Sequence, residues 1–184
     1  MPTRAPRFEA LRDSARQRPV IAVDLGYSSK RPTCGVATSI LDESKCYRFG
    51  DAVTRVVDLC VGQPKAVLVL EAVLSTRHNS HGNPCDRGGF EKGRSWYYGP
   101  GAVTFLAAMR FLSELDKRLP ERLVIDIAEA FLSNKAIRSR HESDAALIAK
   151  TFWKRRAEHL ADDVKAILPI IGGVPPVRSF AYAP

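Results

Sequence analysis

Apolar residues follow two patterns along this chain, short continuous runs and runs with helical spacing. Continuous apolar runs bounded by polar or glycine-containing turns predict strands buried on both faces. Recurrence every three or four positions predicts amphipathic helices, as for Val53, Val56 and Cys60. The predicted strands are 20–23, 34–40, 46–49, 66–70 and 123–128, and the predicted helices are 7–17, 51–61, 102–119 and 143–168.

The order of these elements predicts an α/β fold with a mixed sheet flanked by helices. Three strands come first and suit an antiparallel meander, and two further strands are each reached through a helix and suit parallel pairing. A chain of 184 residues is long enough for one domain with a sizeable core. We therefore expect a helical extension over 1–18, a domain over 19–168 and an extended tail over 169–184.

Composition narrows the choice of environment and partner. No apolar run approaches the roughly 20 residues needed to span a bilayer, and the arginine-rich N-terminus has no signal-peptide core. The four cysteines lack paired spacing, which suits reduced thiols in a cytoplasmic protein with no membrane partner. The formal net charge of +8 makes nucleic acid the leading candidate partner. The sequence leaves a homodimer open.

A zinc site is an alternative use of the histidines. His78, His81 and Cys85 lie close together in the sequence, but they supply three ligands without the paired spacing of structural zinc sites. An ordinary polar loop is the preferred interpretation.

Two acidic residues stand where a buried core is expected. Asp24 directly follows the apolar run 20–23, and Glu71 directly follows the run 66–70. Burying a carboxylate without a compensating partner costs several kcal/mol, so such a residue needs a cation or a hydrogen-bond network. Ligands of open α/β sheets bind at the carboxyl ends of the strands. We therefore expect Asp24 and Glu71 to share one site.

The last predicted helix supplies a third acid. Asp144 shares a stripe with Ile148 and Phe152, the apolar residues that this helix needs for packing, so it faces the sheet. His141 projects from the same side if the helix begins by Ser139, and a capping box from Ser139 to Glu142 makes that early start plausible. A favourable interaction with the helix dipole also explains an acid here. Because Asp24 and Glu71 already predict a shared site, we prefer the interpretation that Asp144 belongs to it.

Carboxylates with one imidazole form a hard, oxygen-rich ligand set that suits Mg²⁺ or Mn²⁺. Two such ions about 4 Å apart can activate water and stabilise the leaving oxygen in phosphodiester hydrolysis. Asp126 and Glu129 lie on or beside the last predicted strand, and we place both outside the ligand set.

The residues around these acids resemble the RNase H-like superfamily, and within it the RuvC-type junction resolvases and their uncharacterised relatives. Segment 21–26, Ile-Ala-Val-Asp-Leu-Gly, with 33–37 resembles the first hairpin and its catalytic Asp. Segment 68–71 resembles the strand with the catalytic Glu, and 141–149 resembles the final helix. The resemblance implies an RNase H-like sheet and catalytic, metal-binding roles for Asp24, Glu71, His141 and Asp144.

Two features depart from the resolvase pattern. His141 replaces the commoner Asp, and segment 75–101 is closer to a poorly characterised branch whose members are classed as nucleases by inference. This segment is basic and aromatic. We expect it to contact nucleic acid, its phosphates through the basic side chains and its bases by stacking. The expected contact residues are Arg77, Arg87, Lys92, Arg94, Trp96 and Tyr97.

Three functions compete for this sequence. The first is a nuclease dependent on Mg²⁺ or Mn²⁺ that cleaves structured or single-stranded nucleic acid, DNA in preference to RNA. The second is a nucleic-acid-binding or adaptor protein that keeps the fold without the chemistry. The third is a phosphotransferase of the actin-like kinase class, suggested by 24–26, but it needs a second nucleotide-binding domain for which the chain has no room. The nuclease is the preferred prediction.

Overall fold

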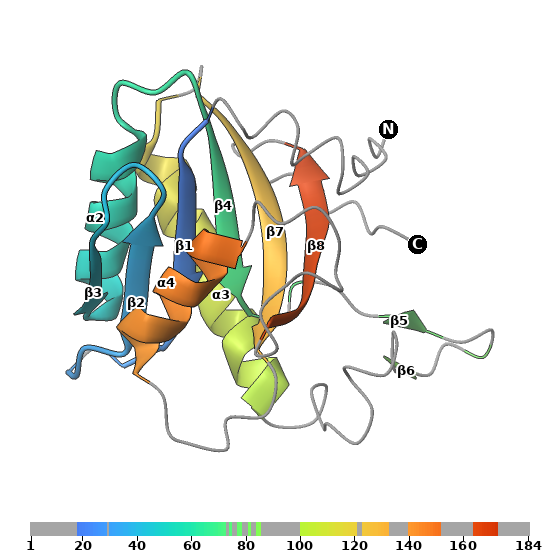
Figure 1. The fold of residues 1–184 in the computed structure, drawn as a ribbon. Helices are drawn as coiled ribbons and strands as arrows, with labels where there is room; N and C mark the ends of the chain where they lie inside the picture. The colour runs from blue at the N-terminus through green and yellow to red at the C-terminus, as the bar shows by residue number, and fades with distance from the viewer. Residues whose placement is uncertain are drawn as a thin grey trace.

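The continuous apolar runs of the chain form one mixed sheet in the computed structural model (Figure 1). The structure describes residues 18–28, 30–72, 74, 77–78, 81, 84–85, 100–120, 123–132, 140–151 and 164–172. The strands of the main sheet are β1 (Val20–Asp24), β2 (Cys34–Thr38), β3 (Ser44–Tyr47), β4 (Lys65–Glu71), β7 (Val124–Leu132) and β8 (Val164–Gly172). The helices are α2 (Phe49–Cys60), α3 (Pro100–Arg118) and α4 (His141–Thr151).

The pairing of the strands confirms the predicted fold class. Strands β3, β2 and β1 form an antiparallel meander, and β1, β4 and β7 pair in parallel. The resulting order β3-β2-β1-β4-β7 is consistent with an RNase H-like topology. Strand β8 extends the sheet by pairing antiparallel with β7.

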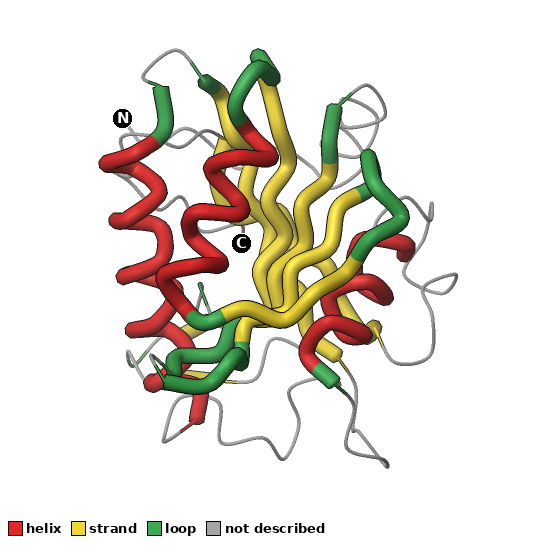
Figure 2. Tube along the Cα trace, turned by 90° about the vertical axis from the view of Figure 1, so that its left-hand side faces the viewer, coloured by secondary structure: helices red, strands yellow, loops and turns green. Residues whose placement is uncertain are grey.

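Helices cover both faces of the sheet (Figure 2). Side chains alternate between the two faces of a strand, so β1 sends Ile21 and Val23 to the α2 and α3 side and Val20 and Ala22 to the α4 side. The core on the α2 and α3 side contains Phe111 of α3. The ring of Phe111 meets that of Phe49 edge to face, with 5.7 Å between the ring centroids. The smaller core beneath α4 consists mainly of valine and alanine. Small side chains on this face allow α4 to lie close to the sheet.

The end of the last predicted helix is wrong. Helix α4 begins at His141 and is described to Thr151, whereas residues 164–168, predicted to be helical, belong to β8. The run 166–171 is apolar and contains three isoleucines, a composition that favours a strand. Pro169 cannot donate a ladder hydrogen bond and is tolerated because β8 lies at the edge of the sheet.

Other element boundaries differ from the predictions by a few residues. Strand β3 begins and ends two residues before the predicted 46–49, and β7 extends four residues beyond the predicted 123–128. A short additional pair, β5 (Arg77–His78) and β6 (Pro84–Cys85), forms a separate two-stranded sheet. The predicted helix 7–17 lies outside the described residues. The division into extension, domain and tail stays a prediction.

Among the described helices, none is both long enough and apolar enough to cross a bilayer.

Candidate metal centre

Asp24 and Glu71 are neighbours across two parallel strands. Each is the last residue of its strand, and the register of β1 and β4 places Asp24 beside Glu71. In both strands the residues two positions earlier, Ala22 and Val69, belong to the core beneath α4. Because side chains alternate along a strand, both acids are placed on the α4 side of the sheet.

Asp144 reaches the same place from α4. It lies in the first turn of that helix, and Ala145, Ile148 and Ala149 pack the helix onto the sheet. One carboxylate oxygen from each of Asp24, Glu71 and Asp144 lies within 4.8 Å of those of the other two. The predicted convergence of these three acids is confirmed. We refer to Asp24, Glu71 and Asp144 as the acidic cluster.

The acidic cluster is largely removed from water. Asp24 and Asp144 are each 5% exposed. The Oε2 atom of Glu71 is buried and accepts no hydrogen bond from the described residues, although Glu71 has other interactions. Carboxylates held this close repel one another, and burial adds to the cost of their charges. A divalent cation would offset both effects, so the three residues fit a metal ion of the hard, oxygen-preferring kind.

His141 contacts the acidic cluster through Asp24. Its Nδ1 atom lies 2.7 Å from Oδ2 of Asp24. An ionised carboxylate can only accept a hydrogen bond, so in the state with Asp24 ionised the donor of this contact is Nδ1. A neutral ring then has its lone pair on Nε2. The structure therefore places His141 beside Asp24, and its role as a metal ligand or catalytic residue stays a prediction.

A glycine under α4 permits this arrangement. Gly35 in β2 is the register partner of Asp24 on the side opposite Glu71. A Cβ atom built on Gly35 would overlap the carbonyl group of His141 and lie 2.7 Å from the backbone nitrogen of Glu142. Only a residue without a side chain allows the start of α4 to approach the sheet so closely. Gly35 thus helps to set the height of His141 and Asp144 above Asp24.

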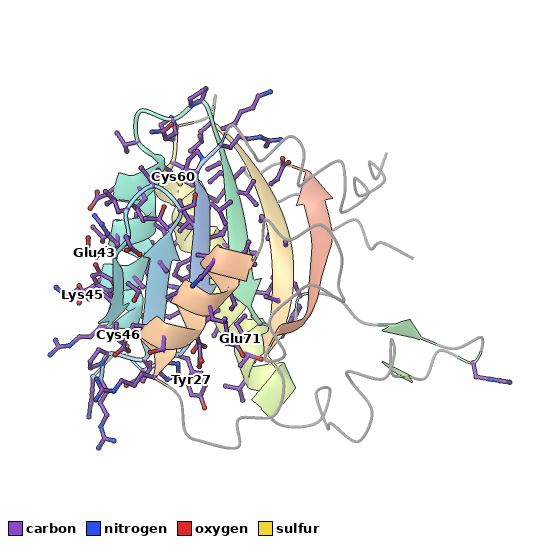
Figure 3. The ribbon with its side chains drawn as sticks, in the orientation of Figure 1. Tyr27, Glu43, Lys45, Cys46, Cys60 and Glu71 are labelled. Carbon is purple, nitrogen blue, oxygen red and sulfur yellow. The ribbon has the colours of Figure 1, made fainter. Side chains whose placement is uncertain are left out.

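An open cavity of about 630 Å³ adjoins the acidic cluster. Asp24, Glu71 and His141 line it together with Tyr27 and Arg31 from the β1–β2 loop and Thr104 from α3. Figure 3 shows Tyr27 and Glu71 at the same end of the sheet. The cluster is therefore accessible from one side, although its carboxylates are mostly buried.

Asp126 lies away from the cluster and has a different partner. It forms an ion pair with Arg18, and both side chains are mostly buried. Its register partner is Val67, near the start of β4, whereas Glu71 is at the end of that strand. Glu129 is the register partner of Leu70. The acidic cluster does not include Asp126, whereas the side chain of Glu129 lies outside the described part, so its exclusion from the ligand set stays a prediction.

Most of the predicted nucleic-acid contacts lie outside the described residues. Arg77 is in β5, where only the backbone is described. Arg87, Lys92, Arg94, Trp96 and Tyr97 all lie outside the described part. The alternative zinc site depends on the side chains of His78 and Cys85, which also lie outside it, while His81 is exposed.

Sequence reasoning missed three residues of this region. Gly35 lies within the predicted strand 34–40, and the sequence pattern predicts no role for Tyr27 or Arg31. A usable signal exists for Tyr27 and Arg31, because they are an aromatic and a basic residue three and seven positions after the strand that ends in Asp24. The close approach at Gly35 depends on the packing of α4, a segment distant in the sequence.

Comparison of this chain with protein-family models, with curated proteins and with solved structures finds no match. The assignment of a function therefore depends on the geometry of the acidic cluster and its surroundings.

Proposed function

We propose that this protein is a metal-dependent nuclease that hydrolyses phosphodiester bonds in structured or single-stranded nucleic acid. The observation that carries the proposal is the acidic cluster, with its ligand oxygens within 4.8 Å of one another at the carboxyl ends of two parallel strands. The sheet order, which is consistent with an RNase H-like topology, supports the same reaction class. The analogy of fold strengthens the proposal, but the site carries it.

Asp24, Glu71 and Asp144 would hold Mg²⁺ or Mn²⁺, because both ions prefer oxygen ligands. When bound, such ions supply an activated water and neutralise the charge that develops on the phosphate and the leaving oxygen. The chain itself provides fixed carboxylates on two paired strands and one helix. Burial of Asp24 and Asp144 limits competition from bulk water for their oxygens.

His141 would accept a proton from the attacking water in the cavity beside Asp24. Donation from Nδ1 to Asp24 at 2.7 Å fixes one rotation of the imidazole ring. The lone pair on Nε2 of the neutral ring can accept a proton from an attacking water. The side chain is 42% exposed and lines the cavity, so substrate can reach it. In this proposal His141 both orients Asp24 and accepts a proton.

Nucleic acid, with DNA preferred to RNA, remains the proposed substrate. The net charge of +8 favours polyanions in general. An open cavity of about 630 Å³ beside carboxylates suits a phosphate that arrives with a metal ion, since a bare phosphate would be repelled by the acids.

The proposal is tested with a panel of labelled DNA and RNA substrates, including single strands, duplexes, flaps and four-way junctions. Each is incubated with the full chain in Mg²⁺, in Mn²⁺ and in excess EDTA. We expect cleavage in one or both metals and none in EDTA. Asp24→Asn, Glu71→Gln and Asp144→Asn should each abolish cleavage. Asp58→Asn, which changes an exposed acid on α2, is the matched control.

The outcome decides between the nuclease and the adaptor. Tight binding of one substrate without cleavage in either metal would assign the non-catalytic role. Cleavage that survives all three substitutions in the acidic cluster would show that the activity does not come from this site.

A further inference from the structure

Side-chain to backbone hydrogen bonds join the described residues of the loop between β1 and β2. The backbone N–H of Ser28 donates to Oγ1 of Thr33 at 3.2 Å. The Ser28 hydroxyl in turn accepts from the backbone nitrogens of Lys30 and Arg31 at 3.3 and 3.0 Å. Side-chain hydrogen bonds to nearby backbone groups are a common way to stabilise turns. The described part of this loop therefore holds Tyr27 and Arg31 in a defined arrangement.

The base of the loop is closed by close packing. A Cβ atom on Gly26 would overlap both the backbone oxygen and the side chain of Thr33, so the two ends of the loop are in direct contact. The thiol of Cys34 also donates to the Gly26 carbonyl at 3.1 Å. These contacts tie both ends of the loop to the strands on which the acidic cluster depends.

The loop presents an aromatic ring at the rim of the cavity. Tyr27 is 64% exposed, the second highest value among the large hydrophobic side chains described as exposed. Arg31 is also exposed and lines the same cavity as Asp24 and Glu71. A tyrosine that is so exposed contributes little to the core, and a fixed loop reduces the entropy lost when it binds a ligand.

We propose that the β1–β2 loop is a nucleic-acid-binding element in which Tyr27 stacks on a base next to the scissile phosphate and Arg31 contacts a neighbouring phosphate. This inference rests on the proposed nuclease function, and it names a binding site in addition to the basic and aromatic segment 75–101. The ligand is a strand with at least one unpaired base near the cleavage point, because a base inside a duplex cannot offer its face to Tyr27.

The charge of the site and the shared cavity support the two proposed roles. The acidic cluster accepts phosphate only with a metal ion, so a cation from the chain is needed to hold the next phosphate. Arg31 lies on the wall of the same cavity and supplies it. Stacking is sequence-tolerant because every base has an aromatic face. The element therefore selects for unpaired structure more than for base identity.

The test measures binding of a fluorescently labelled single-stranded DNA oligonucleotide and of a matched blunt duplex. All variants are made in the His141→Asn chain in Mg²⁺, because this substitution should keep metal affinity while slowing consumption of the probe by about 10²- to 10⁴-fold. Tyr27→Ala should weaken single-strand binding about tenfold, because the substitution removes one base–aromatic stacking contact. Duplex binding should change much less, and Tyr27→Phe should bind like the parent.

The salt dependence of binding distinguishes the role of Arg31 from that of Tyr27. Arg31→Ala should reduce the slope of log Kd against log salt by about one unit, and Arg31→Lys should retain it. Tyr27→Ala should leave this slope unchanged. The controls are Ile40→Ala, an exposed residue 50% accessible after β2, and Arg118→Ala at the last residue of α3. Neither control residue lines the cavity.

The same substitutions in the otherwise unchanged chain give a second measurement. Tyr27→Ala should raise KM for single-stranded or branched substrate with little change in kcat, because the ring is not placed at the reacting atoms. If Tyr27→Ala and Arg31→Ala match their controls in binding and in KM while the parent cleaves, the inference is wrong and the nuclease function stands. If the parent neither binds nor cleaves any substrate, both are wrong.

Discussion

Gly35 lies against the backbone of His141, close enough that a methyl group on Gly35 would overlap the His141 carbonyl. The contact joins β2 to the first residue of α4, the helix that carries His141 and Asp144. Since the obstacle is backbone and cannot rotate away, any side chain at Gly35 must displace the start of the helix. The geometry of the acidic cluster therefore depends on a residue that is not itself part of it.

Gly35→Ala should weaken metal binding and lower activity by displacing α4. Overpacking of this kind costs about 1–3 kcal/mol of stability. We expect a lower melting temperature and a weaker rise of that temperature on adding Mn²⁺. Gly50→Ala is the matched control, because a Cβ atom there meets nothing within 4 Å. Gly50 lies in α2, where alanine is the better helix former, so the control should be neutral or stabilising. Equal metal responses in both variants would contradict the positioning role of Gly35.

Asp24→Asn should raise the stability of the metal-free protein while removing its response to metal. The substitution deletes one of three carboxylates held within 4.8 Å of one another, so repulsion falls. In the unsubstituted chain, metal at 100 times its Kd should add about 2.7 kcal/mol to the free energy of unfolding. Thermal unfolding with EDTA and with Mg²⁺ measures both effects, and Asp58→Asn should behave like the parent. A lower melting temperature for Asp24→Asn in EDTA would show that repulsion is not the dominant cost.

Substitutions of His141 should separate its two proposed roles. Asparagine can still donate a hydrogen bond to Asp24 but has no equivalent of Nε2. We expect His141→Asn to keep metal affinity close to that of the parent while turnover falls by about 10²- to 10⁴-fold, the usual contribution of a proton acceptor. His141→Ala should lose turnover and also weaken metal binding. Near-normal turnover of His141→Asn would leave only the orienting role.

Cys34 and Cys60 should resist alkylation in the native protein. Burial raises the pKa of both thiols from 9.0 to about 12, so neither is a thiolate near neutral pH. Above pH 9 the unfolded chain ionises these thiols first, so between pH 9 and about 12 they favour unfolding. Peptide mapping after iodoacetamide treatment at pH 8 should find Cys46, which is half-buried, modified before the other two. Rapid labelling of Cys60 in the native state would contradict the described packing of α2.

The sequence predicts the centre of the fold better than its edge. The strands that become β1 and β4 are unbroken apolar runs between polar residues, and such runs have few alternatives to a buried sheet. For the segment that forms β8, the sequence predicts the end of a helix at 168 and an extended tail from Pro169. On an edge strand a proline is acceptable, but only the pairing with β7 shows that β8 lies at an edge.

The acidic cluster could be predicted because its cost is visible in the sequence. A carboxylate at the end of a buried apolar run needs a cation or hydrogen bonds whatever the tertiary structure, so the sequence alone marks Asp24 and Glu71 as candidate site residues. The hydrogen bond from His141 to Asp24 and the contact at Gly35 depend on the height of α4 above the sheet. That height follows from packing between distant segments, which no local pattern encodes.

Because side chains alternate between the two faces of a strand, the protein should tolerate insertions and deletions in its turns better than within its strands. Loss of one residue from within 67–70 would turn Glu71 to the α3 face of β4, or shift the whole strand against β1. Such a change would remove one ligand from the acidic cluster even if a sheet still formed. In the turn at 61–64 the same loss falls outside any ladder. Related proteins should therefore vary in length at the turns. Within the strand before the acid, we expect no change by a single residue, since such a change would turn the acid to the other face of the sheet.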